Sequence, residues 1–187
     1  MFRTLPDIRN TILEEHIVDL AENKIGSLSA QQKILWDDFF AIYNSDNILQ
    51  KKDIDPILLK QFLPNLWMAD LIFDESGALK DVEVRLMGTK VASIFGERTG
   101  NHVLSEKHPN AFAQELNVST QQVIDVANLL LHEKRPVVSL ETRLSPTSKE
   151  KLNATALMFA VRNNSEHINM VLGHTEVEIT ERTAIVI

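Results

Sequence analysis

Two groups of strand-like segments, separated by a mostly helical stretch, constrain this 187-residue chain more than any other feature. The first group is a short apolar run over 65–73, followed by a glycine-containing turn and an alternating return over 81–87. The second group covers 136–144, 152–161 and 167–177. Strands grouped in this way around a helical middle predict an α+β domain built on one antiparallel sheet.

An amphipathic segment opens the chain. Apolar residues recur there at helical spacing, at Ile8, Ile12, Leu13, Ile17 and Leu20. This pattern predicts an N-terminal helix within residues 1–28. Such a stripe either packs on the sheet or pairs with its twin in a homodimer, and we expect at least partial use in a homodimer.

Capping residues mark further helix starts. Ser29, with Gln32 three residues later, predicts a capping box, and Asp55-Pro56 places an N-cap residue before a first-turn proline. Ser119 precedes a clearly amphipathic segment and predicts another helix.

Composition narrows the class of protein. The chain has 19 basic and 26 acidic residues, a net charge of −7, which disfavours nucleic acid as a partner. The absence of cysteine excludes disulfides, thiolate catalysis and cysteine-ligated metals. Neither a signal-peptide core nor an apolar run of roughly 20 residues occurs, so we expect a cytoplasmic protein without membrane association.

Several short motifs occur in a fixed order along the middle of the chain. They are Asp53-Ile54-Asp55-Pro56, Phe62-Leu63-Pro64, Val84-Arg85-Leu86-Met87-Gly88-Thr89, Phe95-Gly96 and Thr99-Gly100. In this order they resemble a family of small bacterial PAS proteins, most closely over 39–101. The strand grouping by itself fits a ferredoxin-like arrangement as well as a PAS-like one.

The resemblance implies a five-stranded antiparallel sheet with helices on one face and a small internal cavity. It divides the chain into the N-terminal helix, a PAS-like domain over 29–177 and a C-terminal tail over 178–187. It also implies a sensory or protein–protein role and supplies no catalytic residues, so we expect no enzyme activity.

A cavity, if present, is expected between the sheet and the short helices after Gly88. The residues expected near it are Trp67, Arg85, Met87, Phe95, Leu130 and Met158. Their aromatic and methionine side chains also fit an ordinary core. Arg85 either holds an anionic ligand through its guanidinium or pairs with Asp70 to pin the sheet, and the second interpretation is favoured.

No motif indicates a cofactor or a metal. The six histidines, which fall in no metal-binding spacing, are His16, His102, His108, His132, His167 and His174. Haem and flavin are therefore disfavoured, and no metal site is expected.

Three hypotheses of function remain open. The preferred one is a PAS-type sensory or interaction module that binds an unknown small ligand, a partner protein, or both. The second is a small-molecule carrier or enzyme that uses the same cavity with Arg85 as its anion anchor. The third is a structural subunit with a filled core.

Overall fold

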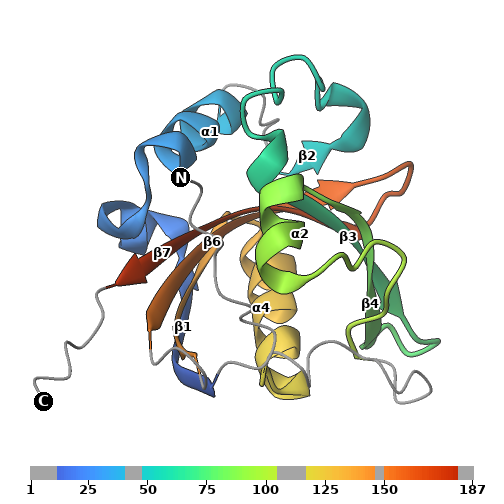
Figure 1. The fold of residues 1–187 in the computed structure, drawn as a ribbon. Coiled ribbons are helices and arrows are strands. Elements are labelled where there is room, and N and C mark those ends of the chain that lie inside the picture. The colour runs from blue at the N-terminus through green and yellow to red at the C-terminus, as the bar shows by residue number, and fades with distance from the viewer. Residues whose placement is uncertain (1–11, 41–47, 105–116, 146–149, 181–187) are drawn as a thin grey trace, which may run out of the picture.

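Seven strands form one open sheet in the computed structural model, which describes residues 12–40, 48–104, 117–145 and 150–180 (Figure 1). Six of them lie in the order β1-β5-β6-β7-β3-β4 and pair antiparallel. The short β2 lies off this path and pairs in parallel with β6. The predicted α+β class with an antiparallel sheet is confirmed.

The strands are β1 (Ile12–Leu20), β2 (Leu49–Gln50), β3 (Leu66–Phe73), β4 (Leu79–Met87), β5 (Val137–Leu144), β6 (Lys151–Arg162) and β7 (Met170–Thr180). The α-helices described are α1 (Ala30–Phe40), α2 (Thr89–Phe95) and α4 (Thr120–Glu133). Short 3₁₀ segments are η1 (Ala21–Ser27), η2 (Lys51–Asp53) and η3 (Leu63–Asn65). All five predicted strands are present, with shifts at their ends.

The prediction of an N-terminal helix is wrong for the part of residues 1–28 that the structure describes. Residues 12–20 form β1, which pairs with β5 from Ile12↔Leu144 to Leu20↔Val137. A register shift between Leu13 and Glu15 leaves Glu14 as an extra residue, so Leu13 and Ile17 lie on different faces of the strand although they are four positions apart. In a helix, residues four positions apart lie on one face, so this spacing looks like an amphipathic helix in the sequence. Eight cross-strand partners outweigh that weak local preference.

The described sheet extends beyond both of the domain limits expected from the sequence. Before the N-terminal limit, β1 over residues 12–20 is part of the sheet. β7 continues to Thr180, so the first three residues of the expected tail over 178–187 lie in a strand. Residues 1–11 and 181–187 lie outside the described part.

Helices cover both faces of the sheet, whereas the prediction placed them on one face (Figure 1). α1 packs Leu35 and Phe39 on one face, where Phe39 meets the ring of Phe159 edge-on at 4.7 Å between centroids. α4 and α2 cover the opposite face through Leu130 and Phe95. The sheet is therefore the middle layer of three.

The capping box predicted at the start of α1 is confirmed. The Ser29 N–H donates to Gln32 Oε1 and the Gln32 N–H donates to Ser29 Oγ, both at 3.1 Å. The Gln32 amide nitrogen also donates to the backbone carbonyls of Thr155 and His174. The fully buried Gln32 side chain thus caps the first turn of α1 and also fixes that turn to β6 and β7.

His174 lies in the same layer and is fully buried against the ring of Phe62. Neither of its ring nitrogens has a hydrogen-bond partner within the described residues. Burial, assisted by repulsion from Lys90, lowers the pKa of His174 from 6.5 to about 4. The folded protein therefore holds this ring neutral at pH values where the unfolded chain protonates it.

We predict that stability falls as the pH is lowered from 6.5 to about 4, because protonation of His174 then favours the unfolded chain. The loss from this residue is roughly 3 kcal/mol at most. The variant His174→Leu should lose that part of the slope in urea denaturation measured across this pH window. His167→Leu, at an exposed histidine, should keep the wild-type slope. Equal slopes in both variants would contradict the prediction.

Candidate functional site

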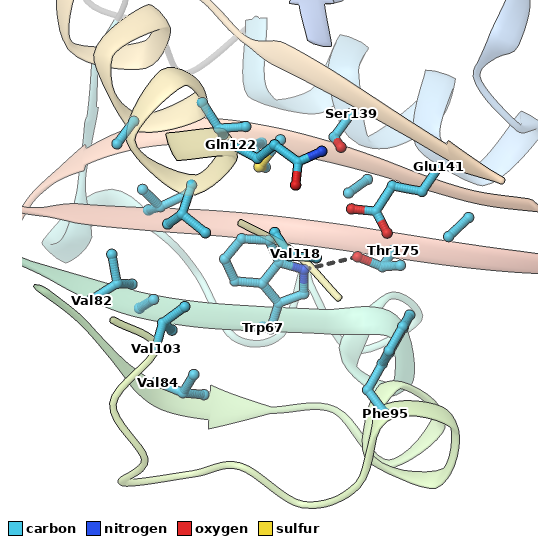
Figure 2. A pocket seen from close by; sticks show the side chains of 18 of the residues that line it. Trp67, Val82, Val84, Phe95, Val103, Val118, Gln122, Ser139, Glu141 and Thr175 are labelled. Carbon is cyan, nitrogen blue, oxygen red and sulfur yellow. Dashed lines mark hydrogen bonds between the residues drawn. The ribbon is translucent and has the colours of Figure 1, made fainter. Parts of the chain in front are cut away.

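A cavity of about 240 Å³ lies between the sheet and helices α4 and α2 (Figure 2). β3 and β4 supply Trp67, Val82 and Val84 to its wall, and Val123 and Val126 come from α4. Its volume lies just below the roughly 300–1,000 Å³ of typical ligand pockets. A compact molecule therefore fits it better than an extended cofactor.

Five of the six residues predicted from the sequence line this cavity: Trp67, Met87, Phe95, Leu130 and Met158. They come from β3, β4, α2, α4 and β6, so only the tertiary fold brings them together. Whether they contact a ligand stays a prediction.

Arg85 does not belong to the cavity, so the expectation that it lies there is wrong. Its side chain is 52% exposed, and its guanidinium contacts Asp70 at 2.5 Å and Glu83 at 2.9 Å. The hydrogen bond with Asp70 raises the pKa of Arg85. The interpretation that Arg85 pairs with Asp70 is thereby confirmed.

Strand alternation turns Arg85 away from the cavity, because its neighbour Val84 lines that cavity, and a bulge in β4 follows at this point. Met68 pairs with Leu86 and Ala69 pairs with Val84, which leaves Arg85 as the extra residue. After the bulge the alternation changes phase, so Leu86 turns outward and Met87 turns to the cavity.

Trp67 lies across β7 at the floor of the cavity. Its partner in the sheet is Gly173, where a Cβ atom would overlap the indole ring. The indole N–H donates to Thr175 Oγ1 at 2.9 Å (Figure 2). A residue without a side chain is therefore required beneath the ring, and the hydrogen bond fixes the ring's direction.

Polar side chains gather at the end of the cavity formed by β1 and β5. His16 Nε2 and Ser139 Oγ are hydrogen bonded at 2.9 Å, with the donor set by the tautomer. Glu141 Oε2 accepts from Arg143 Nε at 3.0 Å and from Nη2 at 2.8 Å. The Arg143 side chain is only 1% exposed. A charge-assisted pair is thus buried beside an apolar cavity.

From the sequence, His16 is considered only as a metal ligand, and Ser139, Glu141 and Arg143 are not singled out at all. Alternation places Ser139, Glu141 and Arg143 on one side of their strand, a pattern typical of a solvated face. In the structure β5 is covered on both faces, and this polar side is the one that borders the cavity. A prediction that residues 12–20 pair with β5 as a strand would have indicated that His16 lies beside Ser139 and Glu141.

The polar cluster resembles a catalytic triad in composition but not in geometry. Glu141 Oε1 lies 3.7 Å from His16 Nε2, the same nitrogen that contacts Ser139. A triad needs the acid on the other ring nitrogen, where it orients the base. The arrangement therefore suits hydrogen bonding to a ligand better than activation of the serine.

The described residues contain no group of three or more histidine or acidic side chains placed to hold a metal ion. Among the same residues, no helix is long and apolar enough to span a bilayer.

Searches of protein-family models, curated proteins and solved structures found no match to this chain. Function is therefore inferred from the cavity itself.

We predict that Arg143→Leu lowers the free energy of unfolding by roughly 3 kcal/mol, because Glu141 then keeps a partly buried charge without its partner. The double variant Arg143→Leu, Glu141→Leu should recover most of this loss. Urea denaturation measures both changes. Arg85→Leu, which removes an exposed ion pair, is the matched control and should cost much less. Additive losses in the double variant would contradict the prediction.

Proposed function

We propose that this chain is a PAS-type sensory module that binds a small molecule in the cavity between the sheet and α4. The observation that carries this proposal is a mostly apolar cavity with hydrogen-bonding groups gathered at one end. Such an arrangement orients a small ligand while apolar burial supplies most of the affinity. A filled structural core would not leave this volume.

The chain order of the sheet supports the PAS-type assignment. β3, β4, β5, β6 and β7 occupy adjacent places in one antiparallel sheet, with α2 and α4 between the second and third of them. Five adjacent antiparallel strands around a helical middle agree with part of what the sequence resemblance implies, although the helices cover both faces of the sheet. β1 extends it by one strand beyond β5.

β1 is the element that would transmit the binding of a ligand in the cavity to the protein surface. Its His16 side chain borders the cavity, while Ile12 and Ile17 on its outer side are 53% and 37% exposed. A homodimer through N-terminal helices is not proposed, because the described part of this segment begins with a strand over Ile12–Leu20. We place contacts with a partner protein on the outer side of β1, in a cytoplasmic setting.

An enzyme that anchors an anion through Arg85 is the weaker alternative. Arg85 lies outside the cavity and is engaged by Asp70 and Glu83. The arginine that does border the cavity, Arg143, is engaged by Glu141. Binding without turnover is therefore the function we assign.

We predict that Ala156→Leu abolishes the binding of toluene, a probe matched to the apolar wall, because the larger side chain fills the cavity. Saturation-transfer NMR should detect toluene on the wild type and on Ala30→Leu, whose substitution lies at the exposed start of α1. It should detect none on Ala156→Leu. Toluene bound equally to all three proteins, or to none, would overturn small-molecule binding at this cavity.

We also predict that toluene slows amide hydrogen exchange in β1 more than in α1, which lies on the other face of the sheet. Val18 and Leu20 of β1 pack beside the cavity, so opening of the strand releases the occupant. At free toluene ten times its Kd, exchange that requires this opening should slow roughly ten-fold. Equal effects on β1 and α1 would remove β1 from the signalling route.

A further inference from the structure

Two hydrogen-bonding atoms at the cavity are unused. Glu141 Oε2 takes both hydrogen bonds from Arg143, whereas Oε1 has none among the described residues and only a 3.7 Å approach to His16. Gln122 of α4 uses Oε1 to accept the N–H of Ser119, the N-cap, at 2.7 Å. Its Nε2 has no hydrogen-bond partner in the described ranges. One acceptor and one donor thus border the same space.

These two groups lie on opposite walls of the polar end. Gln122 belongs to the first turn of α4, and Glu141 belongs to β5 in the sheet beneath it. Figure 2 shows the amide of Gln122 and the carboxylate of Glu141 turned toward the same part of the cavity. A ligand group between them meets an acceptor on one side and a donor on the other.

The charge of the polar end indicates a neutral ligand. Glu141 and Arg143 are the oppositely charged members of one close pair, and the rest of the lining apart from His16 is uncharged. An anion would be repelled by the Glu141 carboxylate, and a cation would be repelled by the Arg143 guanidinium, which also lines the cavity. A hydroxyl group avoids both costs, since one oxygen donates to Glu141 and accepts from Gln122.

We infer that the cavity selects a compact uncharged alcohol or phenol, its hydroxyl held between Glu141 Oε1 and Gln122 Nε2 and its hydrocarbon body against the apolar wall. This inference rests on the proposed function of the cavity and specifies the chemical class of its ligand. The apolar body is accommodated by Val82, Val84, Val123 and Met158.

Four probes of similar shape test the inference by isothermal titration calorimetry: p-cresol, toluene, benzylamine and benzoate. The wild type should bind p-cresol roughly ten-fold more tightly than toluene, because the hydroxyl adds two hydrogen bonds, one of them to a carboxylate. Benzylamine and benzoate should bind more weakly than p-cresol. A charged probe that binds more tightly than p-cresol would overturn the neutral class.

The variant Gln122→Glu tests the role of the Gln122 Nε2 donor separately from the rest of the cavity. Glutamate keeps an oxygen for the Ser119 N–H, so the capping box that starts α4 is preserved while the Nε2 donor is lost. The preference for p-cresol over toluene should fall from roughly ten-fold to near one, with toluene binding itself retained. Retained toluene binding also shows that the variant is folded.

Asn128→Glu is the matched control, since it adds the same charge at an exposed position of α4 away from the cavity. It should keep the wild-type preference. An unchanged preference in Gln122→Glu, or a wild type that prefers toluene, would overturn the inference while leaving cavity binding intact. A wild type that binds no probe would instead overturn the proposed function.

Discussion

The polar side of β5 is buried, and much of the structure depends on the partners that its polar side chains find within the protein. Ser139, Glu141 and Arg143 occupy alternate positions on a strand that has neighbours on both edges and layers on both faces. Polar groups removed from water need partners within the protein. Arg143 finds one along its own strand in Glu141, and Ser139 finds one across the sheet in His16 of β1.

This solution leaves a polar corner in an apolar layer. Around it the floor is made of small residues, Ala154 and Ala156, which do not fill the space above them. Gly173 allows the Trp67 indole to lie on the sheet instead of standing in the cavity. Empty volume and unused hydrogen-bonding atoms therefore occur together, which is the combination that a ligand site requires.

Most of the fold could be predicted because local patterns and tertiary structure agree over β3–β7. The capping residues Ser29 and Ser119 each begin a helix as predicted. β1 could not be predicted from its own residues, since a bulged edge strand and an amphipathic helix distribute apolar side chains alike. Its identity is fixed by β5, which lies far away in the sequence.

The apolar half of the candidate site was also predictable, because large apolar residues at alternate positions of neighbouring strands and on the facing helices converge on one layer. The polar half was not. Arg85 was chosen for its place next to apolar neighbours, yet alternation along β4 turns it outward, and the bulge beside it turns Met87 to the cavity. Arg143 was passed over because alternation makes a buried polar side look identical to a solvated one. Only elements distant in the sequence distinguish the two: α4, which covers this face, and β1, which pairs with β5 in the sheet.

The pairing of β1 with β5 has a consequence for how the protein is made. His16 and its partner Ser139 are 123 positions apart, so β1 is synthesised long before the strand that it pairs with. At ordinary translation rates this delay is on the order of ten seconds. During that time β1 is an unpaired strand with an apolar side, the kind of segment that chaperones protect. The polar end of the cavity is therefore completed only after β5 has emerged, when the much earlier β1 joins the sheet beside it.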